Sequence, residues 1–163
     1  MSAEYERILA ENARFVEAFD RSALTAAPLT GVAILACMDA RIAVEDALGI
    51  RVGDAHIIRN AGGFATQDAI RSLVVSQQLL GTREIIVVAH TGCGLYGADE
   101  AAVRALVAQT TGHPTDLVFG AFSDLEATVR DQVRILREDP SLMNVPVHGL
   151  VYDVATGRLD EVT

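Results

Sequence analysis

The stretch that most constrains the fold is the apolar run Ile85-Ile86-Val87-Val88-Ala89, which leads directly into His90-Thr91-Gly92-Cys93. Four of the five apolar residues are β-branched, which favours a strand. Polar residues do not alternate with them, which is typical of a strand buried on both faces of a parallel sheet. The sequence therefore predicts a central strand over residues 84–89, with an imidazole and a thiol at its carboxyl end.

A second apolar run, over residues 32–36, ends in the same way, because Cys37 follows it directly. If the two runs are parallel neighbours, their carboxyl ends lie at one edge of the sheet, which is where open α/β sheets bind ligands. Cys37, His90 and Cys93 would then bind one Zn²⁺ and leave its fourth position open, as in catalytic zinc sites. Two buried free thiols are the alternative at this point.

The rest of the pattern predicts one α/β domain over residues 1–163. We expect a mostly parallel central sheet of four strands plus a short edge strand, flanked by helices. The expected strands cover 32–36, 54–59, 84–89, 147–154 and 158–162. The expected helices cover 2–20, 42–49, 66–80 and 98–109, with a last one that begins at the capping box Ser123–Glu126 and stops before Pro140. Gly81 is expected to end the third helix in a left-handed cap.

The first expected helix, within residues 1–20, carries an apolar stripe. Its members recur mostly at helical spacing: Tyr5, Ile8, Leu9, Phe15, Val16 and Phe19. A terminal helix this apolar must dock either on its own domain or on a partner subunit.

Composition excludes several classes of partner. The net charge is −9 and there is no basic run, which argues against binding nucleic acid or anionic membrane surfaces. We see no membrane-spanning run and no secretory signal pattern. Two cysteines do not form a disulfide framework, and a reduced compartment suits thiolates that bind a metal, so we expect a cytoplasmic protein.

Asp39 and Arg41 follow the candidate ligand Cys37 in an expected loop. A carboxylate at this position has two possible roles: it accepts a hydrogen bond from zinc-bound hydroxide, or it becomes the fourth ligand and closes the site. Arg41 can hold the carboxylate in a bidentate pair. The alternative is an Asx-turn with a surface salt bridge, which would contribute little to stability.

Three blocks together resemble the β-class carbonic anhydrases, in particular the compact branch found in actinobacteria and other prokaryotes. They are residues 37–41 (CMDAR), 59–62 (RNAG) and 90–94 (HTGCG), and they occur in the order and spacing of that family. The match extends from the first predicted strand to the last. Cys-x-Asp-x-Arg followed about fifty residues later by His-x-x-Cys is a specific combination, whereas neither block alone would be.

The resemblance implies a zinc-dependent enzyme that hydrates carbon dioxide reversibly to bicarbonate and a proton. Cys37, His90 and Cys93 would be the zinc ligands, and zinc-bound hydroxide would be oriented by Asp39, which Arg41 holds. Asp39 would bind zinc only in a closed site. The resemblance also implies a dimer or a larger assembly such as a tetramer. The active-site cleft would lie at the subunit interface, and the N-terminal helix would lie over the neighbouring subunit.

The substrate contacts are less well defined by the sequence. We predict that Asn60, Gly62 and Gly94 contact substrate, with turn-capping by Asn60 as the alternative. Many family members carry a glutamine nine residues before the first cysteine ligand, where this chain has Pro28, which offers no donor. Alternative functions are hydrolysis of carbonyl sulfide or carbon disulfide on the same zinc site, and a non-catalytic zinc- or bicarbonate-binding protein.

The three remaining histidines have separate interpretations. His56 is expected to be structural or exposed, His148 is expected to be a satisfied core or edge residue, and His113 is a candidate proton relay to solvent.

Overall fold

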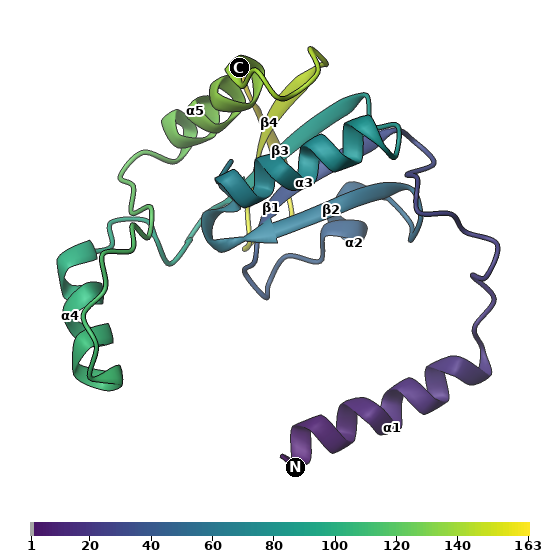
Figure 1. Ribbon diagram of the computed structural model, residues 1–163, viewed down its shortest axis with the longest axis horizontal. Coiled ribbons are helices and arrows are strands. Elements are labelled where there is room, and N and C mark those ends of the chain that lie inside the picture. Colours follow the sequence, from purple (N-terminus) through teal and green to yellow (C-terminus); the bar gives the residue numbers. More distant parts are fainter. Residues whose placement is uncertain (1) are drawn as a thin grey trace.

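A five-stranded sheet with the order β2-β1-β3-β4-β5 organises the computed structural model, which describes residues 2–163 (Figure 1). The strands are β1 (Val32–Cys37), β2 (Ala55–Asn60), β3 (Glu84–His90), β4 (Val147–Tyr152) and β5 (Leu159–Val162). The first four are parallel, and the short edge strand β5 pairs antiparallel with β4. The predicted fold class is confirmed.

The register of the sheet sets the position of each strand end. Strand β1 lies between β2 and β3, and Ala36 is opposite Arg59 on one side and Val88 on the other. Consequently β1, β2 and β3 all finish at the same edge of the sheet. This edge carries the residues of all three motif blocks.

Both faces of the sheet are covered, as the uninterrupted apolar runs indicate. On one face, alternate residues of the central strands pack against the helices α3 (Gln67–Gln78) and α5 (Leu125–Glu138). On the other face, the intervening residues pack against the segment around the short helix α2 (Val44–Leu48). Strand β3 is therefore buried from both sides over most of its length.

Side-chain caps mark the N-termini of most helices. Ser2 caps α1 (Ala3–Glu17), Thr66 caps α3 and Asp99 caps α4 (Glu100–Thr111), each through its side chain. Two expectations need correction. The cap of α5 is Asp124, whose Oδ1 accepts from the Ala127 amide at 2.9 Å, so the predicted box at Ser123 does not form. Helix α3 is capped at Leu79, and Gly81, at φ +84°, lies beyond it in the turn to β3.

Two helices stand away from the sheet. Helix α1 lies at the end of a long connector, and α4 projects at another side of the molecule (Figure 1). Neither contains a buried residue. The apolar stripe of α1 is about half exposed, from 48% at Phe15 to 62% at Val16. Within residues 2–163, none of the helices has the length and apolar character that a membrane span requires.

The turn after β2 packs tightly against β1. The 3₁₀ turn η1 (Ala61–Gly63) contains Gly62 and Gly63, both buried and both at positive φ. A Cβ atom on Gly63 would lie 2.9 Å from the Cys37 amide nitrogen and 3.0 Å from the Ala36 carbonyl carbon. Backbone meets backbone at this point, so neither side can move aside cheaply.

We therefore expect Gly63→Ala to lower the free energy of unfolding by about 3 kcal/mol, from left-handed strain plus overpacking. Urea unfolding measures this loss. Gly81→Ala is the matched control, because Gly81 has φ +84° and nothing within 4 Å of the added Cβ. It should lose only about 1 kcal/mol. Equal losses in the two variants would contradict the close approach at Gly63.

Candidate metal centre

The three candidate zinc ligands meet at one edge of the sheet. Cys37 is the last residue of β1 and His90 the last of β3, and Cys93 follows in a tight turn at Gly92, which has φ +65°. The Sγ atoms and an imidazole nitrogen of this cluster all lie within 4.8 Å of one another. Both cysteines are buried and neither is in a disulfide. The convergence agrees with the prediction from sequence, which required the two apolar runs to be parallel neighbours, as β1 and β3 are.

His90 is oriented for ligation. Its side chain is 1% exposed, and its Nδ1 lies 2.9 Å from the Thr91 carbonyl oxygen. That carbonyl can only accept, so Nδ1 carries the proton and Nε2 has a free lone pair. Nε2 is buried and has no hydrogen-bond partner within the described residues. An orphaned buried nitrogen facing two thiols is a set of donors that fits Zn²⁺.

The two thiols reinforce that fit. Burial raises the pKa of the Cys93 thiol above its ordinary value, and the nearby Cys37 raises it further. Two sulfur atoms this close do not ionise together without a compensating positive charge. A bound divalent cation supplies that charge, because it favours the thiolate form of its ligands.

Asp39 and Arg41 form the pair that the sequence suggested. Arg41 donates from Nε to Asp39 Oδ1 at 2.9 Å and from Nη2 to Oδ2 at 2.7 Å, and its amide also donates to Oδ1 at 2.9 Å. These bonds hold the pKa of the Asp39 carboxyl well below its usual range. Asp39 Oδ2 lies 3.7 Å from His90 Nε2. The carboxylate therefore borders the position where a metal would bind.

Arg41 also connects the two halves of the centre. Its Nη2 donates to the Gly92 carbonyl at 2.9 Å, which links the turn after β1 to the turn that carries Cys93. A surface salt bridge would make no such cross-connection. The Asp39–Arg41 pair is therefore more than an Asx-turn with an isolated surface salt bridge.

The predicted substrate contacts have varied surroundings. The Asn60 side chain caps its own turn, because Oδ1 accepts from the Phe64 amide and Nδ2 donates to the Phe64 carbonyl, both at 2.8 Å. Gly62 is buried beneath the Phe64 ring, and Gly94 is exposed. Contact of Asn60, Gly62 or Gly94 with substrate stays a prediction. Pro28 is buried.

Three aromatic residues near the centre were missed by sequence reasoning. Phe122 packs edge-on against Tyr96 and Phe64, with ring centroids 5.7 and 6.2 Å apart. The Phe122 amide donates to the Leu95 carbonyl at 3.1 Å, which joins the loop after Cys93 to the segment before α5. No local pattern could have indicated this pairing, because it joins two irregular segments.

The other histidines lie outside the cluster. His56 is held by Ser76 Oγ and the Ala26 carbonyl, each at 2.7 Å, and His148 lies 3.2 Å from Glu84 at the surface. His56 matches its structural interpretation, whereas His148 is an exposed residue of the inner strand β4 and not the core or edge residue that we expected. His113 is exposed, and its role as a proton relay stays a prediction.

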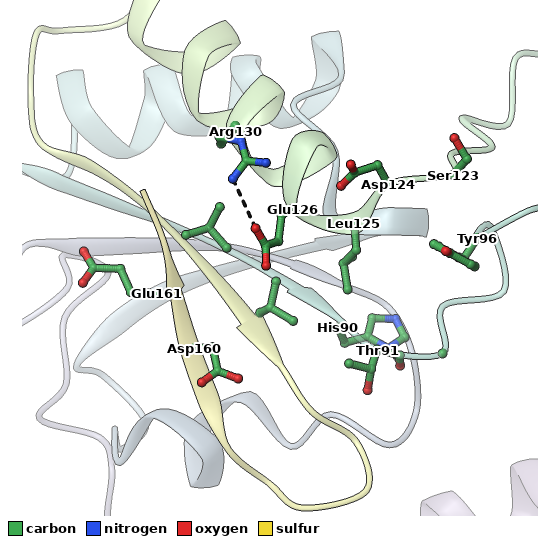
Figure 2. A pocket seen from close by; sticks show the side chains of 13 residues that line it. His90, Thr91, Tyr96, Ser123, Asp124, Leu125, Glu126, Arg130, Asp160 and Glu161 are labelled. Atoms are coloured by element: carbon green, nitrogen blue, oxygen red, sulfur yellow. Dashed lines mark hydrogen bonds and ion pairs between the residues drawn. The ribbon is translucent and has the colours of Figure 1, made fainter.

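A cavity of about 720 Å³ lies behind His90, between β5 and the start of α5 (Figure 2). Thr91, Tyr96 and Leu125 line one end, and Glu126 and Arg130 form an ion pair at the other. Among the described residues that line it, neither cysteine nor Asp39 is present. We therefore do not assign it as the route to the metal position.

Comparison with known proteins gives a consistent result. The sequence model described as carbonic anhydrase matches residues 32–159. The chain is 41% identical over 156 residues to β-carbonic anhydrase 1 of Mycobacterium tuberculosis, covering 95% of both chains. It is also 40% identical over 152 residues to the carbon disulfide hydrolase of Saccharolobus solfataricus, covering 77% of this chain and 74% of the relative.

Among solved structures, the carbonic anhydrase of Streptococcus mutans superposes with a TM-score of 0.94 at 39% identity, covering 100% of this chain and 99% of the other. The family model, the sequence relatives and the solved structure agree over residues 32–159, and the chain belongs to the β-class carbonic anhydrases.

Proposed function

We propose that this protein hydrates carbon dioxide reversibly to bicarbonate and a proton, with Zn²⁺ held by Cys37, His90 and Cys93. The observation that carries the proposal is the buried, unpartnered Nε2 of His90, which faces two thiols and lies 3.7 Å from Asp39 Oδ2. Zinc at such a site lowers the pKa of a water towards ~7 and so makes hydroxide available near neutral pH.

The chain's own contribution is orientation of the nucleophile. Asp39 is ionised, so its oxygens only accept hydrogen bonds, and Arg41 already donates to both of them. A hydroxyl beside Oδ2 must therefore point its proton at the carboxylate and its lone pair away, towards substrate. The bidentate pair with Arg41 supports the open form of the site, in which Asp39 is not a ligand.

The runner-up function is hydrolysis of carbon disulfide, because relatives with that name match at almost the same identity. Coverage favours carbon dioxide: the mycobacterial carbonic anhydrase aligns over 95% of this chain, and the carbon disulfide hydrolase over 77%. One zinc-loaded preparation should be assayed with both substrates. Faster release of hydrogen sulfide than hydration of carbon dioxide would reverse our assignment.

Removing one candidate ligand tests zinc binding directly. Cys93→Ala should lower the zinc content from about one ion per chain to less than about 0.1, because two ligands do not hold the metal. Metal analysis of the purified protein measures this. His148→Gln, which removes an exposed imidazole beside Glu84, is the control and should keep its zinc. Full zinc occupancy in Cys93→Ala would remove Cys93 from the ligand set.

A further prediction concerns the rate of carbon dioxide hydration. Asp39→Asn should retain zinc but lower kcat for hydration by about 100-fold, because the amide no longer enforces the direction of the proton. Stopped-flow measurement of kcat for hydration across pH 6–9 tests this, with Asp46→Asn, at an exposed position, as the control.

In the wild type we expect the rate of hydration to rise with pH across this range. Two thiolates donate more charge to the metal than three imidazoles do, and so leave its bound water less acidic. A flat profile would contradict this account.

We also propose that α1 docks on a second copy of the chain, because its apolar stripe is half exposed in the subunit. Leu9→Asp should weaken self-association by at least ~10-fold, since burying an unpaired charge is costly. Ala10→Asp adds the same charge on the opposite side of the helix and should change little. Analytical ultracentrifugation over a concentration series compares them. Equal effects, or a monomeric wild type, would rule out this interface.

A further inference from the structure

Arg59 occupies a position that the proposed mechanism does not use. It is the penultimate residue of the edge strand β2, opposite Ala36 of β1. Its guanidinium reaches past the end of β1, where Nε donates to the Cys37 carbonyl at 3.0 Å and Nη2 donates to the Asp39 carbonyl at 2.7 Å. One planar group thus bridges the main-chain carbonyls of Cys37, a candidate metal ligand, and of Asp39, whose side chain pairs with Arg41.

These two bonds continue the sheet where its ladder ends. The parallel register between β1 and β2 stops at Cys37 and Asn60, and the Met38 amide still donates to the Asn60 carbonyl at 2.9 Å. Beyond that point, the Arg59 side chain takes the place of a strand partner. The segment 37–39 is thereby attached to the end of β2 at three points.

The usual roles of an exposed arginine do not fit Arg59. Throughout residues 2–163 it forms no ion pair, and both of its hydrogen bonds go to main-chain carbonyls. A lysine could not reproduce this arrangement, because an ammonium is a point charge whereas a guanidinium presents donors in a rigid planar fork. The fork therefore fixes how the two carbonyls are oriented relative to each other.

We propose that Arg59 is a positioning residue for the metal centre, an inference that rests on the proposed function of that site. It holds the Cys37 thiolate and the Asp39 carboxylate in a fixed relation from the β2 side. Arg41 holds the same carboxylate from the β3 side, through its bond to the Gly92 carbonyl. Without Arg59, the Cys37 and Asp39 carbonyls would lose their fixed relative orientation, and the thiolate and carboxylate would lose their alignment with His90.

The test compares Arg59→Ala and Arg59→Lys with the wild type. The control is Arg134→Ala, which removes an exposed arginine of α5 that pairs with Asp131 and Glu138. Each protein is loaded with Co²⁺, and its thiolate-to-cobalt and ligand-field absorption bands are recorded. Zinc affinity is measured by competition with a chromophoric chelator, and kcat and KM for carbon dioxide are determined on the zinc forms.

For Arg59→Ala we expect zinc affinity or kcat to fall by about 10- to 100-fold, the usual effect of removing a group that orients metal ligands. The cobalt bands should shift, and KM should change by less than about two-fold because no substrate contact is lost. Arg59→Lys should resemble Arg59→Ala. Added guanidinium ion should restore part of the loss in Arg59→Ala, and Arg134→Ala should match the wild type throughout.

The inference is overturned if Arg59→Ala keeps wild-type cobalt bands, zinc affinity and kcat, or if it loses only thermal stability with the bands unchanged. If Arg59→Ala does not fold, Arg59→Lys decides on the same readouts, and unchanged values in it overturn the inference. A wild-type protein that hydrates no carbon dioxide would contradict the proposed function, whereas the cobalt and affinity measurements would still decide the role of Arg59.

Discussion

The parallel pairing of β1 with β3 is the constraint on which the metal centre depends. It places Ala36 opposite Val88, so that both strands finish at one edge and deliver Cys37 to within ligand distance of His90 and Cys93. The pairing is itself dictated by burial, because two strands apolar on both faces satisfy their backbone groups only inside a sheet covered from both sides. The candidate ligands are thus brought together by the pairing of the core strands, because Cys37 and His90 are the last residues of β1 and β3.

Beyond the core, three kinds of contact hold together the segments that follow these strand ends. Gly63 lets the turn after β2 lie directly on the backbone of β1. Arg41 joins the Asp39 turn to Gly92, and the Phe122 ring with its backbone bonds braces the loop after Cys93. All three act across the sheet edge between segments far apart in sequence. These contacts connect the segments on which Cys37, His90 and Cys93 lie.

Much of this was predictable because the decisive signals are local. Uninterrupted β-branched runs identify buried strands, and Ser2, Thr66 and Asp99 cap helices as their types suggest. The ligand set followed from two strand ends and the parallel-sheet rule. Local signals failed where two of them compete: Ser123 and Asp124 are both good caps, and the chain uses Asp124. Side-chain contacts between segments far apart in sequence, such as Arg59 with the Cys37 carbonyl or Phe122 with Tyr96, have no signature in sequence spacing.

The candidate ligands of this chain do not by themselves indicate which substrate it takes. Relatives named carbonic anhydrase and carbon disulfide hydrolase match this chain at 41% and 40% identity, so sequence identity does not separate the two activities. Both substrates are small and linear, and each carries an electrophilic carbon that the same nucleophile can attack. Discrimination would then depend on the residues around Cys37, His90 and Cys93, whose polarity and spacing would decide which molecule reaches the Asp39 carboxylate. In this chain the Asp39–Arg41 pair borders that position and the turn at Gly63 packs on the backbone of Cys37, so the geometry of segment 37–41 matters as much as the three atoms that would hold the metal.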